Sequence, residues 1–329
     1  MIPGVILSNR GLNFLKKSQV KPVDLLNFFG TPKEKLLSTD GITNILLLGI
    51  RGEGSDSPNL SDTIIIFSYD HENRRPPAII SVPRDLYIPS AQAKINSAYH
   101  YGEEASPGAG IIKAQGAIQE IIGLPIHYTA VVNFSLFRDI IDSFGGLDVN
   151  NEIAFTDNEF PIPGKETALP ISSRYETISF SAGLIHLDGE QALKYVRSRH
   201  SQGETGTDFS RSKRQQSVIS ALRSKIISPD FLLNENRVNS LIDLVNRKLI
   251  TNIPPSIYPA FAKLALDTKE KQIKNISISD RPDSKGVTIL YHPPLYKYRG
   301  EWVLIPKDNN WKALKQYVQQ ELGSTTAQP

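Results

Sequence analysis

The sequence has 329 residues, of which 40% are hydrophobic and 22% are charged, with a net charge of +3. This composition is typical of a globular protein of one large or two smaller domains and excludes a disordered or fibrous chain. The chain has no cysteine, which excludes disulfides, thiolate metal sites and cysteine nucleophiles.

The first 40 residues predict a polar lead-in, which would be juxtamembrane if the protein is anchored. No apolar run approaches the roughly 20 residues of a membrane-spanning helix. We therefore expect either a cytoplasmic protein or an anchor that lies outside this chain. Residues 41–323 predict a single domain without repeats or linkers, and residues 324–329 a short tail.

The first half of this domain predicts alternating strands and helices. Residues 44–48 form a continuous apolar run of the kind buried on both faces of a sheet. Further strands are expected at 63–69, 78–82, 128–132 and from 147, and helices at 109–122 and 134–144. This alternation favours a layered α/β fold.

The second half predicts mainly helices. Residues 154–180 are polar and carry prolines, so we expect a long surface loop there that is able to act as a lid. Helices are expected at 189–195, 208–227, 237–249, 256–266 and 311–322, with short strands near 276 and 303.

Acidic residues and arginines occur at the predicted strand ends. If the second and third strands pair as a hairpin, Asp62 and Arg84 lie near the same edge. Arg197 and Arg199 share one face if their segment is extended. Further along, the spacing i, i+3 and i+7 places three residues on one face of a helix: Asp208, Arg211 and Gln215.

Four arginines with two or three carboxylates indicate a pyrophosphate site with a divalent cation. A guanidinium binds phosphate oxygens in pairs, and carboxylates share such a site only when a hard cation bridges them to the phosphates. The basic residues gather mainly between 194 and 223, which favours one local anionic ligand over nucleic acid. The alternative is structural: Asp208 caps its helix, the arginines pair with Glu204 or Asp85, and nothing binds.

Seven segments occur in an order that resembles the LytR-CpsA-Psr (LCP) family of bacterial envelope phosphotransferases. They are Asn44–Gly49, Ser61–Thr63, Ser81–Asp85, Lys94–Tyr99, Phe144–Val149, Leu187–Arg199 and Asp208–Gln216. The resemblance spans about residues 44–226.

The resemblance implies a three-layer α/β/α sandwich with a central mixed sheet, here a single LCP catalytic domain over residues 41–323. It implies an apolar tunnel for a polyprenyl chain, with the pyrophosphate at its mouth. The implied site has Asp62 as a magnesium ligand and Lys94 flanking the cleft. Arg84, Arg197, Arg199 and Arg211 are implied to bind the pyrophosphate, and Asp85, Asp208 and Gln215 to orient those arginines or touch the phosphate. Lys94, Asp208 and Gln215 thereby join the pyrophosphate-binding set.

One position departs from the family pattern. Family members usually carry a second acidic metal ligand just after the first strand, where this chain has Arg51. The Mg²⁺ (or Mn²⁺) ion that the resemblance implies would then need Asp56 or Glu53 as its second carboxylate. Alternatively, Arg51 takes over part of the charge of the metal.

The implied activity is transfer of a glycan phosphate from a polyprenyl-pyrophosphate carrier onto peptidoglycan or another cell-wall polymer. Family members face outward from an N-terminal membrane helix, so the implied location is extracytoplasmic, at the membrane surface. Asp62 and Asp85 are the candidate general bases, beside Arg84, Arg197 and Arg199 in the catalytic set. Two alternatives remain: hydrolysis of the carrier lipid, and binding of that lipid without catalysis.

The residues that line a lipid tunnel are less clearly indicated. Apolar side chains at helical spacing are mostly ordinary core, which is the favoured interpretation for each candidate. The candidates are Ile118, Ile122, Phe134, Phe137, Ile141 and Phe144.

Overall fold

The computed structural model describes residues 36–283 and 285–323. Most of the predicted lead-in and the predicted tail therefore lie outside the described residues. Within the described part, no helix has both the length and the apolar character that crossing a bilayer requires.

A six-stranded mixed sheet forms the middle of the domain. Its strands, in spatial order, are β11 (Ile250–Thr251), β6 (Tyr128–Asn133), β1 (Ile42–Ile50), β2 (Ser61–Asp70), β3 (Ala78–Ser81) and β12 (Lys274–Ser277). β1 pairs parallel with β6 and antiparallel with β2, and β2 pairs antiparallel with β3. The predicted hairpin of the second and third strands is thereby confirmed.

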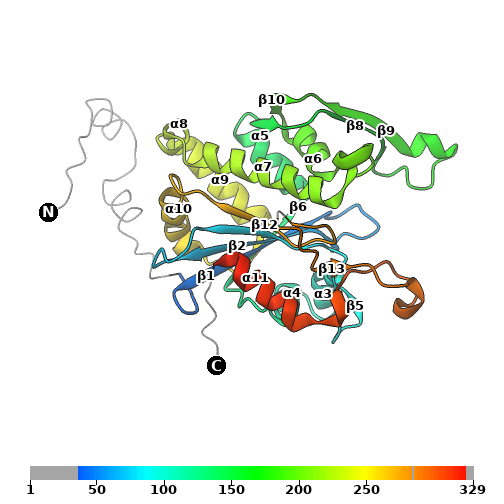
Figure 1. The fold of residues 1–329 in the computed structure, drawn as a ribbon. Coiled ribbons are helices and arrows are strands. Elements are labelled where there is room, and N and C mark those ends of the chain that lie inside the picture. The colour runs from blue at the N-terminus through cyan, green and yellow to red at the C-terminus, as the bar shows by residue number, and fades with distance from the viewer. Residues whose placement is uncertain (1–35, 284, 324–329) are drawn as a thin grey trace, which may run out of the picture.

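Helices cover both faces of this sheet (Figure 1). One layer contains α3 (Ala98–Ala105), α4 (Gly110–Ile122) and α11 (Trp311–Leu322). The other contains α5 (Phe134–Ser143), α6 (Gly189–Arg197), α7 (Asp208–Ile226), α8 (Pro229–Leu232), α9 (Glu235–Lys248) and α10 (Tyr258–Asp267). The arrangement is the predicted three-layer α/β/α sandwich.

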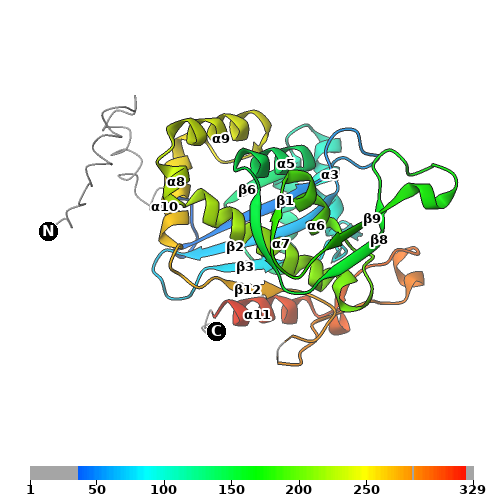
Figure 2. The same cartoon turned by 90° about the horizontal axis from the view of Figure 1, so that it is seen from above.

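Four two-stranded sheets complete the fold. They pair β4 (Tyr87–Ile88) with β5 (Ala93–Lys94), β7 (Leu147–Asn151) with β10 (Gly183–Leu187), β8 (Phe155–Pro161) with β9 (Tyr175–Phe180), and β13 (Leu290–Tyr291) with β14 (Ile305–Pro306). The prediction of a loop over 154–180 is wrong, because β8 and β9 form an antiparallel hairpin that projects from the domain (Figure 2).

The helix ends follow from local sequence. α4 ends at Gly123, whose φ of 81° is the left-handed conformation that glycine adopts at little cost. α6 begins with a capping box, in which the Asp188 side chain and the Gln191 side chain each accept a backbone N–H of the other residue.

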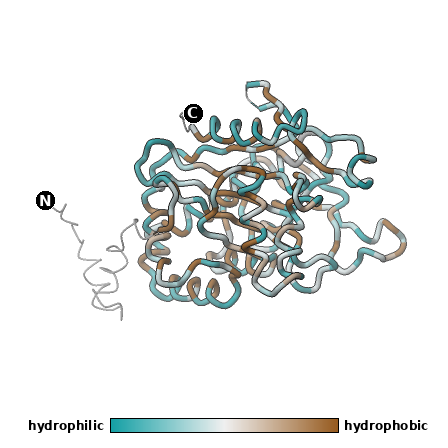
Figure 3. Tube along the Cα trace, turned by 90° about the horizontal axis from the view of Figure 1, so that it is seen from below, coloured by the Kyte–Doolittle hydropathy of each residue, from teal (hydrophilic) through white to brown (hydrophobic). Residues whose placement is uncertain are grey.

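The two faces of the sheet are packed differently. Leu46 and Leu48 of β1 are buried in the main core with α4 and α11. On the opposite face, α5, α6 and α7 form a separate cluster that contains no residue of the six-stranded sheet. Successive side chains of a strand point to opposite faces, so Leu47 faces this second helical layer. Figure 3 shows hydrophobic stretches running through the middle of the molecule and hydrophilic segments at its rim.

Candidate functional site

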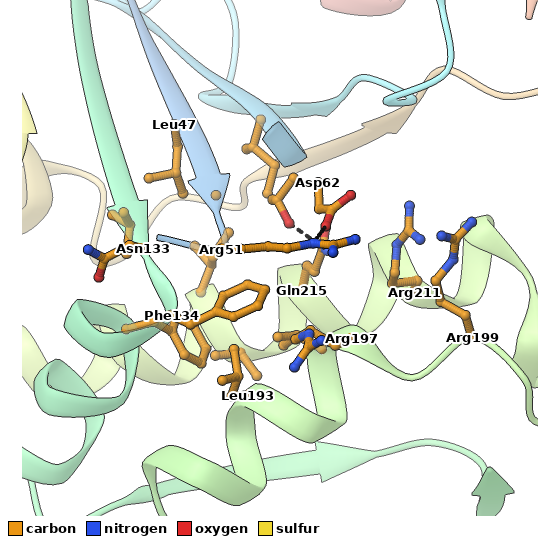
Figure 4. A pocket seen from close by; sticks show the side chains of 18 of the residues that line it. Leu47, Arg51, Asp62, Asn133, Phe134, Leu193, Arg197, Arg199, Arg211 and Gln215 are labelled. Atoms are coloured by element: carbon orange, nitrogen blue, oxygen red, sulfur yellow. Dashed lines mark hydrogen bonds and ion pairs between the residues drawn. The ribbon is translucent and has the colours of Figure 1, made fainter. Parts of the chain in front are cut away.

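Arg51, Asp62 and Arg84 meet at one edge of the central sheet. Arg51 follows the end of β1, Asp62 lies at the start of antiparallel β2, and Arg84 follows β3. Arg51 Nε lies 3.1 Å from Asp62 Oδ2, and Arg84 Nη1 contacts Asp62 Oδ1 (Figure 4). Ligands of open α/β sheets bind at the carboxyl ends of strands, and this is the edge where β1, β3 and β6 end.

The two guanidinium groups determine the charge state of Asp62. Burial alone raises the pKa of this carboxyl, but the charges of Arg84 and Arg51 and their hydrogen bonds outweigh that effect. The pKa of Asp62 is therefore below its ordinary value, and the side chain is a firmly ionised anion.

Asp85 and Lys94 form a second ion pair beside this group. Lys94 Nζ donates to Asp85 Oδ1 at 3.0 Å, and Arg84 Nε lies 3.5 Å from Asp85 Oδ2. Asp85 thus contacts Arg84, as the resemblance implies, and it is 6% exposed.

Arg197 is the last residue of α6, so the segment is not extended there and the condition for a shared strand face with Arg199 is not met, although both residues line the apolar cavity described below. The helix ends because Ser198, with ψ of 134°, leaves the helical conformation. The Arg197 guanidinium lies 4.4 Å from the centre of the Phe134 ring. Burial lowers the pKa of Arg197, and the charge of Arg51 lowers it further.

The segment after α6 is fixed by Asp157, a fully buried carboxylate that the sequence did not indicate. Asp157 Oδ2 accepts hydrogen bonds from Ser198 Oγ at 2.7 Å, from the Arg199 N–H at 3.0 Å and from the His200 N–H at 3.1 Å. Its position in a polar segment that we expected to be a loop gave no sign of this role.

Arg214 holds the same segment from the side of α7. Its guanidinium donates to the carbonyl groups of Tyr195, Ser198 and Thr205 at distances of 2.6–3.0 Å. Burial lowers the pKa of Arg214 to about 10. The buried Asp157 and Arg214 thereby fix the backbone that carries Arg197 and Arg199, which both line the apolar cavity described below.

α7 supplies the predicted Arg211 and Gln215. Gln215 Nε2 donates to Thr63 Oγ1 at 3.0 Å, which ties the helix to β2 next to Asp62. Arg211 is 8% exposed and lies beside Arg199 (Figure 4). Asp208 begins the helix, but its side chain lies outside the described part of the chain, so its predicted role stays a prediction.

Two cavities meet at the arginine cluster, which we define as Arg51, Arg84, Arg197, Arg199 and Arg211. The apolar cavity has a volume of about 290 Å³ and fills the gap between the sheet and the layer of α5, α6 and α7. The polar cavity has a volume of about 550 Å³. Both are lined by Asp62, Thr63, Arg84, Arg199, His200, Arg211 and Gln215.

Four further site residues each line one cavity. Arg51 and Arg197 line the apolar cavity, and Asp85 and Lys94 line the polar one. Of the tunnel candidates, the three on α5 line the apolar cavity: Phe134, Phe137 and Ile141. The others do not: Ile118 and Ile122 are buried in the main core, and Phe144 packs on Phe231.

The side chains present do not fit a divalent cation. Each carboxylate oxygen of Asp62 already accepts from a guanidinium. Asp56 is exposed and lines neither cavity. Among the described residues, no three His, Asp or Glu side chains gather closely enough to hold a metal ion.

The sequence model of the LytR_cpsA_psr family matches residues 15–299. The chain belongs to the LytR_cpsA_psr family. The site described above and the seven segments of the resemblance all lie within the matched residues.

Members of the LytR_cpsA_psr family with curated names resemble this chain over part of their length. A polyisoprenyl-teichoic acid–peptidoglycan teichoic acid transferase, TagU, of Bacillus cereus is 30% identical over 200 residues, which cover 60% of this chain and 56% of that protein. TagU of Enterococcus faecalis is 26% identical over 230 residues, 68% of this chain and 65% of that protein. The chain thus matches little more than half the length of the first of these relatives.

Solved structures of similar proteins share the fold. TagV of B. subtilis has a TM-score of 0.61 at 22% identity, covering 88% of this chain and 100% of that one. TagT bound to LI-WTA has a TM-score of 0.57 at 21% identity, covering 88% and 95%.

Proposed function

We propose that this protein transfers a glycan phosphate from a polyprenyl-pyrophosphate carrier onto peptidoglycan or another cell-wall polymer. The observation that carries the proposal is the junction of an apolar and a polar cavity at the arginine cluster. The donor has an apolar chain, a charged pyrophosphate and a polar sugar. This order matches that of the apolar cavity, the arginine cluster and the polar cavity. The names of the TagU relatives support the same reaction class.

The apolar cavity suits the chain of the donor. Its walls include Leu47 and Ile65 of the sheet, Phe137 of α5 and Ile219 of α7. Each buried CH₂ group contributes about 0.8 kcal/mol to binding by removal from water. The lipid therefore supplies affinity while the arginines position the head group.

The arginine cluster suits the pyrophosphate and the reaction at it. A hydroxyl oxygen of the acceptor attacks the phosphorus that carries the glycan, and the bond from that phosphorus to the bridging oxygen breaks. Polyprenyl phosphate leaves with the bond electrons, and the acceptor keeps the glycan phosphate. Because such transfer depends on positioning and on neutralising phosphate oxygens, fixed guanidinium groups are the groups it needs.

The proton of the attacking hydroxyl needs an acceptor on the side of the polar cavity. Arg51 and Arg84 hold the pKa of Asp62 low, which makes this carboxylate a weak base. Asp85 lines only the polar cavity, where its carboxylate contacts Lys94 and Arg84. We therefore assign proton acceptance to Asp85, and Lys94 positions it.

We place the reaction at the outer surface of the bacterial membrane. The donor's chain needs a bilayer, and the acceptor belongs to the wall. A membrane anchor outside the described residues, as the resemblance implies, would hold the domain at that surface.

A donor assay tests the proposal. The purified protein is incubated with a polyprenyl-pyrophosphate glycan and a peptidoglycan acceptor, and released polyprenyl phosphate and wall-bound glycan are measured. We expect both products in equal amounts, and neither with Arg84→Ala. Polyprenyl phosphate without wall-bound glycan would instead establish a hydrolase, and tight lipid binding without either product a binding protein.

A further inference from the structure

Arg51 lies where a second metal ligand of the family would lie, and the structure shows what it contacts instead. Its Nε group donates to Asp62 Oδ2 at 3.1 Å, while Arg84 contacts Oδ1. A divalent cation placed beside Asp62 would lie between these two guanidinium groups and would be repelled by both. The contacts of Asp62 therefore oppose metal binding.

We propose that the Arg51 guanidinium takes the place of a divalent cation in this site, so that pyrophosphate binds without metal. The proposal rests on the proposed function only for the identity of the lipid that carries the pyrophosphate. Arg51 is then a binding residue for the head group, and Asp62 holds its guanidinium in position.

The backbone around Arg51 is fixed, as such a role requires. The Arg51 carbonyl accepts the Phe134 N–H at 3.4 Å, and the Gly52 N–H donates to the Pro58 carbonyl at 2.9 Å. Gly52 has φ of 88°, and a Cβ there would lie 2.9 Å from Asn133 Cβ. The start of the side chain is therefore set by β1 and α5, while its tip is set by Asp62.

Guanidinium groups concentrate positive charge where the two cavities meet. The arginine cluster contributes five of them, whereas the carboxylates that line one or both cavities are those of Asp62, Asp85, Asp157 and Asp280. Asp85 is paired with Lys94. Arg51 and Arg197 both line the apolar cavity, and the charge of Arg51 is, after burial, the next cause that lowers the pKa of Arg197.

Metal-free calorimetry with inorganic pyrophosphate tests the proposal directly. After removal of divalent metals with a chelator, we expect the wild-type protein to bind pyrophosphate. Arg51→Asp should weaken binding about 10- to 100-fold, because a charged hydrogen bond is lost and an anion is added. The affinity of Arg51→Lys should fall between those of the wild-type protein and Arg51→Asp, since lysine keeps the charge but lacks the planar guanidinium that binds two oxygens at once.

The same substitution should create a metal site. Arg51→Asp places a second carboxylate beside Asp62, so we expect this variant to bind Mn²⁺ in an electron paramagnetic resonance titration and to regain pyrophosphate binding with it. The wild-type protein and Arg51→Lys should bind no Mn²⁺. Arg237→Asp is the matched control: it makes the same charge change on an exposed residue of α9 outside both cavities and should behave as wild type.

Two results would overturn the proposal: wild-type pyrophosphate binding that requires added metal, or wild-type Mn²⁺ binding as tight as that of Arg51→Asp. Turnover of the lipid donor, measured in chelator and in Mg²⁺, separates the two proposals. Turnover only with Mg²⁺ would contradict the role proposed for Arg51 and support the proposed transferase activity. Metal-free pyrophosphate binding with no turnover in either condition would support the role proposed for Arg51 and contradict the proposed transferase activity.

Discussion

At the scale of single residues, the arginines of the cluster are held in different ways. Arg51 and Arg84 are positioned by a carboxylate, whereas Arg197 is positioned by the face of Phe134. A stacked guanidinium keeps its planar edge available for two phosphate oxygens. Arg197 is therefore suited to bidentate contact with the head group.

Replacing this arginine by lysine tests that geometry. Arg197→Lys keeps the charge but loses the planar fork and the stacking, so we expect inorganic pyrophosphate to bind about tenfold more weakly, or about 1.4 kcal/mol. Isothermal titration calorimetry measures the change. Arg138→Lys is the control, because Arg138 pairs with Glu190 outside both cavities and should leave binding unchanged. Equal affinity for wild type and Arg197→Lys would contradict bidentate recognition.

At the scale of elements, the segment between α6 and α7 depends on buried polar partners. Asp157 accepts from three groups of that segment and also from the Glu159 N–H at 3.0 Å. Burial alone raises its pKa, but these hydrogen bonds more than offset it and hold the pKa below its ordinary value. The ionised form is thus the one that the fold stabilises.

Asp157→Asn should lower the free energy of unfolding by about 1–3 kcal/mol at pH 7, because an amide presents donors where donors already point. The contribution of Asp157 is present above the unfolded-state pKa and is lost as pH falls through the lowered folded-state pKa. The difference between wild type and variant should therefore shrink below about pH 4.

Urea denaturation at neutral and acid pH measures this difference. Asp139→Asn is the control, because it removes an exposed ion pair with Lys248 and should change stability by less than about 1 kcal/mol. A difference for Asp157→Asn that stays constant across this pH range would contradict the ionised hydrogen-bond acceptor.

Neighbouring leucines of β1 lie in different surroundings, one in the main core and one at the apolar cavity. Leu46→Ala removes a side chain that is fully buried in the main core and should cost about 2–5 kcal/mol of unfolding free energy. Leu47→Ala enlarges a cavity that already exists and should cost less, about 1 kcal/mol, since fewer packed atoms are lost. Equal losses of unfolding free energy for the two variants in chemical denaturation would contradict a cavity between the sheet and the helical layer.

The sequence predicted those elements whose signals are local. The helix ending at Gly123 and the helix over Trp311–Leu322 are defined by apolar spacing and capping residues, and the structure has both. The hairpin of β8 and β9 was missed because its strands are largely polar and the segment that joins them carries Pro163 and Pro170, so only their pairing reveals them. The candidate site residues were taken from the family segments, whereas Asp157 was missed because its partners in the segment after α6 lie 41–43 positions away in the chain.

At the scale of the whole molecule, the helical layer of α5, α6 and α7 stands off from the sheet and leaves the apolar cavity between them. One end of that cavity reaches the arginine cluster. The fold therefore separates an apolar compartment from a polar one and places positive charge at the boundary.

Filling this cavity should separate lipid binding from head-group binding. We expect Ile219→Trp, on the cavity side of α7, to weaken binding of a polyprenyl-pyrophosphate lipid at least about tenfold by excluding several methylene groups. Binding of inorganic pyrophosphate should stay as in wild type. Ile112→Trp, on the exposed side of α4, is the control. Parallel loss of both ligands would contradict a lipid compartment.

The central claim is tested most directly by following the phosphorus next to the sugar. A polyprenyl-pyrophosphate glycan labelled at that phosphate is incubated with the protein and peptidoglycan, and the label is measured in the wall, in the lipid and in solution. If the protein is a transferase, the label moves into the peptidoglycan and unlabelled polyprenyl phosphate is released. Label released into solution, or label that stays on the lipid, would contradict transfer to the wall.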